Sequence, residues 1–393
     1  MNKLETINKV PERTLSVLSI VWGFSLGGVG KYLTLINNVN RYAPIRIHTL
    51  CILADKWWSD HEALKKLNAH KIRIRSRLDL SWSIKAASFI DAFDPHLIMT
   101  HGFNGHFVAF TARILAKTNI PFICSYHGSY HAISPGRKLV EGLFNFITKR
   151  FIRHFTISCV AVADYSKNYL VERGVSNDKI TVIHNGIDDY KPSPNAREKL
   201  RDEWGIKKNE VVIGVASRLD PVKGVNFLVD TFEKLTKRYD NIRLIVIGSG
   251  TCEDELRSKV SNYEIDGKVV FTGFRSDVPA CLEAMDIFVL PSLAEYHSIG
   301  LLEAMRAGKP IVATNVGGNT ESVSHMKEGV IVPPANVDAL VKGISQLLND
   351  PVLANRLGKA AKIRFRKNFT EEIMVQRTAQ WLMKCGEVAR RRA

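Results

Sequence analysis

Residues 290–321 read LPSLAEYHSIGLLEAMRAGKPIVATNVGGNTE, and this stretch decides the fold. A short apolar run, 286–290, leads into it and is typical of a strand buried on both faces. Ser298 is a suitable N-cap for the helix that follows, and a glycine and a proline would end that helix. The apolar run 311–314 predicts the next buried strand. The stretch therefore predicts a strand–loop–helix–strand unit of an α/β fold.

Two carboxylates flank the start of the predicted helix, Glu295 in the loop and Glu303 about one turn into the helix. A helix N-terminus offers unpaired N–H groups and the positive end of the helix dipole, and both suit a phosphate. The same phosphate would repel the carboxylates unless they bind neutral parts of the ligand, such as ribose and sugar hydroxyls. The residues alone therefore predict a nucleotide-sugar site, and the alternative is a surface loop followed by an ordinary helix.

The stretch resembles the donor-binding motif of the retaining glycosyltransferases of family 4, which have the GT-B fold. The family pattern is Glu, seven residues, Glu, then Ala-Met, Gly-x-Pro-(Ile/Val)-Val-Ala-Thr, Val-Gly-Gly and a later Glu, and all of it is present here. The resemblance covers roughly residues 14–385, densely in the second half and thinly in the first. It implies two domains facing across a cleft, with a C-terminal helix that crosses back to the N-terminal domain.

Strands that alternate with longer helical stretches independently favour two doubly wound, Rossmann-like α/β domains, and 393 residues suffice for two. We expect an acceptor-binding domain over 1–190 and a nucleotide-sugar-binding domain over 209–369. A Pro- and charge-rich stretch predicts a linker over 191–208. Residues 370–393 are expected to form the crossing helix and a basic tail.

Residues 217–224, Ser-Arg-Leu-Asp-Pro-Val-Lys-Gly, follow a predicted strand and are similar to the family's Gly-Arg-Leu-x-x-x-Lys-Gly. Arg218 and Lys223 are the cations that can neutralise a diphosphate there. The predicted helix start contributes the remaining donors for the phosphates, and these belong to Ile299, Gly300 and Leu301.

The resemblance assigns the rest of the donor as well. It implies that Glu303 holds the ribose and that Glu295 holds the transferred sugar. The turn after the apolar run 269–271 would lie near the base, which makes Phe274 and Arg275 base-site candidates. Residues 296–298, Tyr-His-Ser, replace the family's commoner Gly-Phe-Gly, and this departure leaves the identity of the sugar open.

Two features of the first half extend the site. A glycine-rich turn follows the first predicted strand, and the resemblance places its Gly27 and Gly28 near the donor phosphates, although such a turn can be purely structural. His127 follows the predicted strand 121–126 and matches the family histidine beside the donor sugar. His101 ends another strand, and a structural role is an equal alternative for it.

The segment 136–155 reads GRKLVEGLFNFITKRFIRHF. Its apolar residues recur at helical spacing, and five Arg or Lys stand against one Glu. A basic helix with several phenylalanines can lie in a membrane interface, which here would be an anionic membrane surface. The alternative is a helix that packs its apolar face on the sheet and exposes its charges to water.

Composition sets further limits. The formal net charge is +16, which by itself allows nucleic acid, membrane or acidic substrates as partners. No apolar run is long enough to span a bilayer, and the charged N-terminus is not a secretory signal, so we expect a cytoplasmic protein, peripheral on the inner face of the plasma membrane if 136–155 binds it. The six cysteines are scattered, and no Asp-x-Asp pair ends a strand, so no metal cofactor is expected.

We therefore expect a retaining glycosyltransferase that moves a sugar from a nucleoside-diphosphate sugar, most readily a UDP-sugar, to a hydroxyl of a glycan or lipid-linked acceptor. Its pathway would be the synthesis of cell-surface polysaccharide, lipopolysaccharide or glycolipid. One alternative is a nucleotide-sugar epimerase on the same scaffold. The other is a non-enzymatic basic protein that binds polysaccharide or nucleic acid, although the sequence has no recognition-helix or aromatic-sheet signature for nucleic acid.

Overall fold

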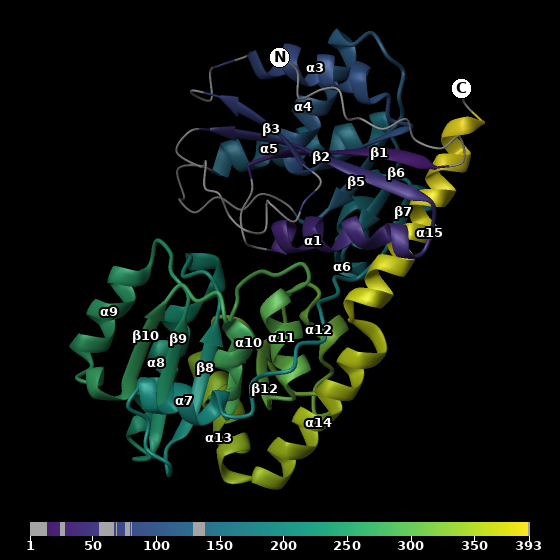
Figure 1. Ribbon diagram of the computed structural model, residues 1–393. Helices are drawn as coiled ribbons and strands as arrows, with labels where there is room; N and C mark the ends of the chain where they lie inside the picture. Colours follow the sequence, from purple (N-terminus) through teal and green to yellow (C-terminus); the bar gives the residue numbers. More distant parts are fainter. Residues whose placement is uncertain are drawn as a thin grey trace. The chain divides into compact units, whose positions relative to one another are not determined.

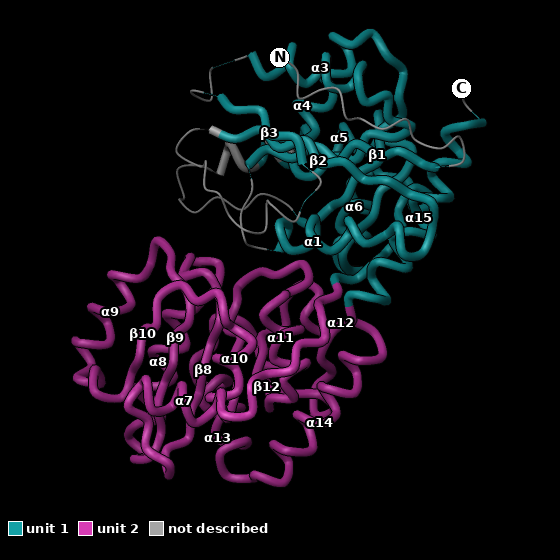
Figure 2. Tube along the Cα trace, viewed as in Figure 1, with its two compact units in different colours: residues 1–185, 371–393 teal, residues 186–370 magenta. Residues whose placement is uncertain are grey.

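The chain forms two compact units, and each is built around its own parallel sheet. Unit 1 comprises residues 1–185 and 371–393, and unit 2 comprises residues 186–370 (Figure 2). The computed structural model describes residues 14–23, 28–54, 67, 69–74, 79, 81–128 and 138–391.

The sheet of unit 1 has the strand order β3-β2-β1-β4-β5-β6-β7, and its described pairs are all parallel. Its strands are β1 (Leu15–Trp22), β2 (Ile45–Ala54), β3 (Ala69–Ile74), β4 (Leu97–His101), β5 (Phe122–Tyr126), β6 (Thr156–Ala161) and β7 (Ile180–Val182). The chain winds outward from β1 in one direction and then resumes on its other side with β4. This order is that of a doubly wound Rossmann-like sheet, and its switch point lies between β1 and β4.

Helices cover both faces of this sheet (Figure 1). They are α1 (Gly28–Ile36), α3 (Ser81–Phe93), α4 (Gly102–Leu115), α5 (Lys138–Phe155), α6 (Asp164–Val171) and α15 (Glu371–Arg390), with 3-10 turns η1 (Asn37–Arg41) and η4 (Asn177–Lys179). On one face α1 and α15 pack against the sheet, and on the other α3, α4 and Phe151 of α5 do so. Trp381 and Leu382 of α15 are buried in the same core as Val17 of β1. The C-terminal helix therefore belongs to the first unit, as the family resemblance implied.

The sheet of unit 2 repeats the same winding with the order β10-β9-β8-β11-β12-β13, again parallel. Its strands are β8 (Val211–Ala216), β9 (Ile242–Ile247), β10 (Val269–Gly273), β11 (Ile287–Leu290), β12 (Ile311–Thr314) and β13 (Val330–Val332). Alternate residues of each strand enter different cores, because side chains alternate across a sheet. Val215 of β8, for example, lies in one core and Ala216 in the other. The switch point of this sheet lies between β8 and β11.

Helices also cover both faces of the second sheet. They are α7 (Ala196–Glu203), α8 (Val225–Thr236), α9 (Glu253–Asn262), α10 (Val278–Glu283), α11 (Ile299–Ala307), α12 (Asn319–Ser322), α13 (Val337–Asn349) and α14 (Pro351–Asn368), with 3-10 turns η5 (Pro221–Lys223) and η6 (Asp266–Lys268). One face carries α8, α9 and α13, the other carries α7, α10 and α11, and α14 contributes residues to both cores. None of the helices in the described part of the chain is long and apolar enough to span a membrane.

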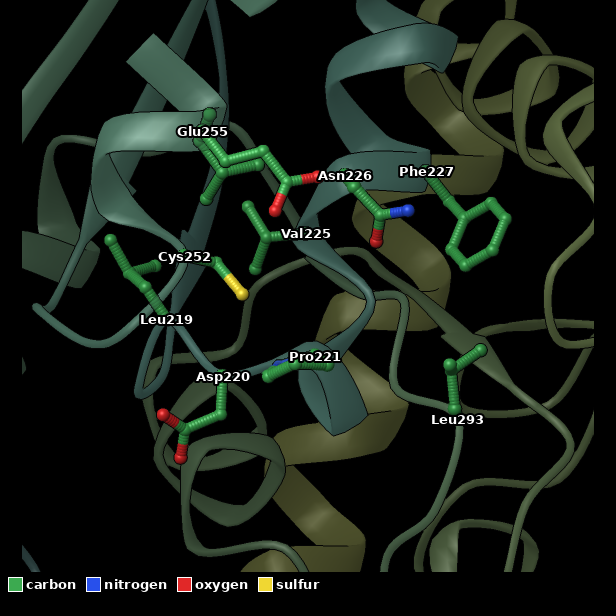
Figure 3. Close-up of a pocket in the computed structure, with 10 residues that line it drawn as sticks. Leu219, Asp220, Pro221, Val225, Asn226, Phe227, Cys252, Glu255 and Leu293 are labelled. Atoms are coloured by element: carbon green, nitrogen blue, oxygen red, sulfur yellow. The ribbon is translucent and has the colours of Figure 1, made fainter. Parts of the chain in front are cut away.

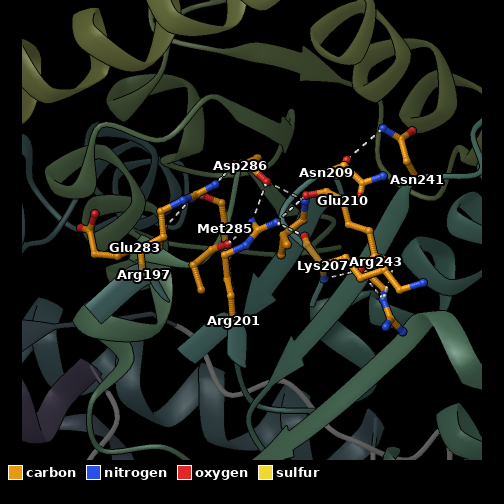
Figure 4. Close-up of polar contacts among 12 residues, drawn as sticks. Arg197, Arg201, Lys207, Asn209, Glu210, Asn241, Arg243, Glu283, Met285 and Asp286 are labelled. Atoms are coloured by element: carbon orange, nitrogen blue, oxygen red, sulfur yellow. Dashed lines mark hydrogen bonds and ion pairs between the residues drawn. The ribbon is translucent and has the colours of Figure 1, made fainter. Parts of the chain in front are cut away.

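Residues 191–208, expected to link the domains, contain α7, which is part of unit 2. Its two arginines face Asp286, the residue before β11 (Figure 4). Arg197 Nη2 lies 2.6 Å from Asp286 Oδ1, and Arg201 Nη1 lies 3.2 Å from Oδ2. The backbone N–H of Val212 donates to the same Oδ2 at 2.8 Å. These contacts hold α7 at the amino ends of the strands, opposite the edge at which such sheets bind ligands.

Candidate active site

The two loops at the switch point of unit 2 carry most of the predicted donor-binding residues. Residues 217–224, hereafter the Arg–Lys loop, follow β8, and residues 291–298 follow β11. Because β8 and β11 are neighbouring parallel strands, their carboxyl ends deliver both loops to one edge of the sheet. That edge is where doubly wound sheets bind their ligands.

Close backbone contacts fix the Arg–Lys loop in place. A Cβ on Gly248, after β9, would overlap the carbonyl oxygen of Ser217, and a Cβ on Gly224 would overlap that of Pro291. Gly224 also has a φ of +63°, which side-chain-bearing residues rarely adopt. The N–H of Leu293 donates to the carbonyl of Val222 at 2.8 Å. The loop is therefore wedged between the ends of β9 and β11.

Helix α11 begins beside this loop. Ser298 caps the helix, and its Oγ accepts from the N–H of Leu301 at 3.4 Å. A Cβ on Gly300 would come within 2.9 Å of the carbonyl oxygen of Ala216, so glycine lets the first turn approach the end of β8 closely. The N–H groups of Ile299 and Gly300 belong to the first turn, where no intrahelical acceptor exists. They are suitable donors for an anion beside the Arg–Lys loop.

Lys223 and Glu295 form an ion pair across the two loops. Lys223 Nζ lies 2.7 Å from Glu295 Oε1, and the side chains are 19% and 8% exposed. The buried hydroxyl of Ser292 donates to the same Oε1 at 2.8 Å. An almost buried carboxylate is thus supported by a cation and a hydroxyl, the kind of compensation that a buried charge requires.

Arg218 has a different environment. Its side chain is 68% exposed, and its Nη1 lies 2.5 Å from Oδ2 of Asp220, which is only 9% exposed. The structure therefore brings an exposed guanidinium, a largely buried ammonium and a helix N-terminus to one edge of unit 2. Such an array can bind a diphosphate.

A pocket of about 210 Å³ adjoins the Arg–Lys loop (Figure 3). It is lined on the loop side by Leu219 and Asp220, and on the α9 side by Cys252 and Glu255. In Figure 3 the sulfur of Cys252 points into this space. None of the predicted donor-binding residues lines the pocket, so it lies behind the loop that carries them.

The remaining candidate residues of unit 2 differ in the exposure of their side chains and in their ion pairs. Glu303 lies half-buried in α11. Phe274 is 62% exposed at the turn after β10. Arg275 next to it forms ion pairs of 2.8 Å with Asp277 and Glu203, and the Asp277 contact raises the pKa of the guanidinium. Arg275 therefore ties the β10 turn to α7, and its guanidinium is already engaged.

In unit 1, His127 follows β5 and belongs to a buried polar cluster. Its Nε2 lies 3.1 Å from Ser125 Oγ and 3.4 Å from His101 Nδ1. His101 Nε2 lies 3.0 Å from Ser19 Oγ on β1. The Tyr32 ring of α1 meets the His127 ring edge-on, with centroids 4.6 Å apart. The cluster thus joins the carboxyl ends of β4 and β5 to α1.

Burial lowers the pKa of His127 to about 4. It also lowers the pKa of His101 well below its usual value, with additional repulsion from His127 and His106. Both imidazoles are therefore neutral near pH 7. Gly28 is the first residue of α1, and Gly27 lies outside the described residues.

Comparison with known proteins assigns the family. The family model "Glycosyl transferases group 1" matches residues 196–364, and "Glycosyltransferase Family 4" matches residues 34–191. The chain belongs to glycosyltransferase family 4. Being a glycosyltransferase, it is neither the epimerase nor the non-enzymatic binding protein that the sequence left as alternatives.

Relatives of this family 4 glycosyltransferase are distant. An uncharacterized glycosyltransferase of Methanocaldococcus jannaschii is 27% identical over 312 residues, which are 74% of this chain and 78% of the relative. A GDP-mannose-dependent alpha-(1-6)-phosphatidylinositol monomannoside mannosyltransferase of Mycobacterium tuberculosis is 31% identical over 184 residues, 44% of this chain. That match spans 48% of the mannosyltransferase, about half its length.

Solved structures share the fold. HepE of Anabaena, in complex with UDP and glucose, superposes with a TM-score of 0.80 at 22% identity, covering 94% of this chain and 100% of that chain. At this identity the similarity shows the architecture, and the glycosyltransferase has the GT-B type with two Rossmann-like sheets.

Sequence reasoning missed the partners of the predicted residues. Asp220 stands two positions after Arg218, and Ser292 three positions before Glu295, so both lay inside stretches that had been singled out. An acid close to a functional arginine, and a hydroxyl close to a functional acid, were the available signals. The sequence allows either a structural or a functional role for His101, and the structure joins it to His127.

Proposed function

We propose that this glycosyltransferase transfers a sugar, with retention of anomeric configuration, from a nucleoside-diphosphate sugar to a hydroxyl of a glycan or lipid-linked acceptor. The observation that carries the proposal is the meeting of Lys223, Glu295 and the α11 N-terminus at the switch point of unit 2. A cation and helix N–H groups suit a diphosphate, and a carboxylate suits a polyol.

The reaction breaks the bond between the anomeric carbon and the β-phosphate oxygen, so negative charge develops on the leaving diphosphate. Arg218, Lys223 and the N–H groups of Ile299 and Gly300 stabilise that charge. Groups fixed before the reaction are the most effective, because they do not reorganise as charge develops. The backbone contacts that wedge the Arg–Lys loop supply this rigidity.

The carboxylates bind the neutral, hydroxyl-bearing parts of the donor. Glu303 binds the ribose hydroxyls, and Glu295 binds hydroxyls of the transferred sugar. The neutral imidazole of His127 can share a hydrogen bond with a sugar hydroxyl without repelling a positively charged anomeric centre. Cations and N–H groups alone compensate the diphosphate in this scheme, so it needs no metal.

UDP is the proposed nucleotide. Support comes from HepE, whose structure contains UDP and glucose, whereas the mycobacterial relative is named for GDP-mannose. The membrane-lipid acceptor in that relative's name supports a lipid-linked acceptor here. With such an acceptor, the enzyme would work at the inner face of the plasma membrane in the synthesis of glycolipid or cell-surface polysaccharide.

A donor screen followed by one substitution tests the proposal. UDP-glucose, GDP-mannose and ADP-glucose are first compared by their effect on the melting temperature, and UDP-glucose is expected to raise it most. Arg218→Ala should then lower turnover of the selected donor by roughly 100-fold or more, since that is the cost of removing one group aimed at the developing charge. Its melting temperature should fall, because the 9% exposed carboxylate of Asp220 loses its ion-pair partner, so turnover is compared well below that temperature. Near-normal turnover in this variant would refute the assigned role.

A further inference from the structure

Asp220 forms an ion pair with Arg218, the cation that precedes it by two residues. Its carboxylate is 9% exposed, and its Oδ2 lies 2.5 Å from Arg218 Nη1. Among the residues that the structure describes, it is the only ion-pair partner of Arg218. Arg218, by contrast, extends into solvent with 68% of its side chain exposed.

The position of Asp220 in the backbone suggests a simpler role, which the contacts exclude. Asp220 is the N-cap residue of η5 (Pro221–Lys223), where an aspartate side chain usually accepts a backbone N–H. Here the side chain makes no capping hydrogen bond. The backbone of Asp220 contributes to this turn through its carbonyl, which accepts from the N–H of Lys223 at 2.9 Å, a contact that any residue could provide. The carboxylate is therefore left to face Arg218.

Burial makes this pairing persistent. A carboxylate that is removed from water and loses its cation is strongly destabilised. Arg218 must therefore remain close to Asp220 even when an anion is bound. A guanidinium can do both, because it has five N–H donors in one plane and its contact with Asp220 is made through Nη1.

We propose that Asp220 is a positioning residue for Arg218 and holds the guanidinium so that its remaining N–H groups face the diphosphate. This inference rests on the proposed donor-binding role of Arg218. A long exposed side chain would otherwise sample many rotamers, and the cost of fixing one of them would add to the barrier of the reaction. With Asp220 in place, the orientation is set before the reaction begins.

Such a role has a characteristic kinetic signature. Because the diphosphate gains charge as the bond breaks, loss of orientation weakens the transition state more than the bound substrate. Asp220→Ala should therefore lower kcat by about 10- to 100-fold, the usual effect of removing a residue that orients a functional group. KM for the donor should change by less than about threefold, because a fixed orientation contributes mainly in the transition state. Asp220→Asn keeps the shape and an acceptor oxygen, so it should restore part of kcat.

A double-mutant cycle with Arg218→Ala tests the inference, using the donor selected by the melting-temperature screen. If Asp220 acts through Arg218, adding Asp220→Ala to Arg218→Ala should cost less than about threefold more, because residues that act as a unit are not additive. The matched control is Asp230→Ala, which breaks a 2.7 Å ion pair with Lys259 in the same unit but away from the Arg–Lys loop. It should leave kcat unchanged in both backgrounds.

The outcomes separate the two proposals. Wild-type kcat in Asp220→Ala, or an equal loss in both backgrounds, would overturn the positioning role while leaving the function of Arg218 intact. Wild-type turnover in Arg218→Ala would instead overturn the proposed function. If Asp220→Ala fails to fold, the cycle is run with Asp220→Asn, which should lose kcat only when Arg218 is present.

Discussion

Glu295 illustrates how one residue can serve both the fold and the reaction. Among the described residues, both hydrogen-bond contacts of its side chain go to Oε1, which accepts from Lys223 at 2.7 Å and from Ser292 at 2.8 Å. The carboxylate is thereby fixed by one oxygen, and Oε2 is left to accept a hydrogen bond from a sugar hydroxyl. Lys223 has three N–H donors, so it can keep Glu295 and still reach a phosphate.

Glu295→Gln should separate the contribution of the carboxylate to stability from its contribution to donor binding. The amide keeps the shape but leaves Lys223, only 19% exposed, without its counter-charge, so the variant should be less stable by about 3 kcal/mol. A bound diphosphate supplies the missing negative charge. UDP should therefore raise the melting temperature of Glu295→Gln by more than it raises that of the wild type.

The control is Glu253→Gln, which removes a partly exposed acid paired with Arg257 at 2.9 Å in α9. It should respond to UDP as the wild type does. A smaller UDP response in Glu295→Gln than in the wild type would mean that Lys223 does not contact the diphosphate.

At the scale of the element, α5 presents two faces of opposite character. Phe151 is buried, with its ring centroid 4.6 Å from that of His106 in α4. Leu143, Phe146 and Ile147, on the outer side, are 54%, 55% and 40% exposed. Basic residues follow on the next turns, Lys149, Arg150 and Arg153. Phe107, Ile114 and Leu115 of the neighbouring α4 are also exposed.

This surface predicts binding to anionic vesicles. Flotation of the protein with vesicles of phosphatidylcholine and phosphatidylglycerol should decrease at least about tenfold when Leu143, Phe146 and Ile147 are replaced by serine. Burial of one large apolar side chain already exceeds the 1.4 kcal/mol that corresponds to tenfold. One molar salt should also weaken binding, because it screens the basic residues.

The matched control replaces Val352 and Ile363, which are 81% and 68% exposed on α14 of unit 2 and do not belong to this surface. That variant should float as the wild type does. Failure of the wild type to float at low salt would remove the membrane proposal.

The sequence predicted the elements with continuous apolar runs, such as β8, β11 and β12, because strands buried on both faces have little else in them. It did not predict β3, an edge strand whose His, Lys and Arg hide its pattern, or β13, which has only three residues. The segment of α7 resembled a linker because it is rich in charge. Its Arg197 and Arg201 point to Asp286, and the sequence alone does not indicate which charges turn inward.

For the candidate active site, the sequence predicted individual residues but not the contacts between them. The motif indicated Lys223 and Glu295 separately, but their pairing joins residues 72 positions apart and depends on how two loops are wedged. Arg275 was expected near the base, and the structure shows it engaged by Asp277 and Glu203. The acid two positions after Arg275 was a signal for that pairing.

At the scale of the whole molecule, histidines with a lowered pKa make unit 1 sensitive to acid. Among the described residues of that unit these are His48, His70, His101 and His127, and burial is the main cause for each. Each is neutral in the folded protein, whereas in the unfolded chain it takes up a proton near pH 6.5. Their contribution to stability is complete above pH 6.5 and is lost as pH falls from 6.5 toward about 4, the pKa given for His48 and His127.

Unit 1 should therefore lose stability between pH 6.5 and 5, by up to about 1.4 kcal/mol per pH unit for a buried histidine such as His101. Carboxylates with lowered pKa, such as Glu210 and Asp277 in unit 2, matter only below that window. Hydrogen exchange measured along the chain at several pH values would follow each unit. Unchanged protection of unit 1 between pH 6.5 and 5 would contradict the prediction, and His48→Phe should reduce the slope of unit 1.

The position of α15 also has a consequence for biosynthesis. The core of unit 1 contains Trp381 and Leu382, yet the ribosome makes these residues only after all of unit 2. Every strand of unit 2 comes from the continuous segment 186–370. During translation unit 2 can thus fold completely before unit 1. The apolar core of unit 1 stays partly exposed until α15 has been made. A nascent chain arrested near residue 370 should accordingly attract chaperones to its N-terminal half.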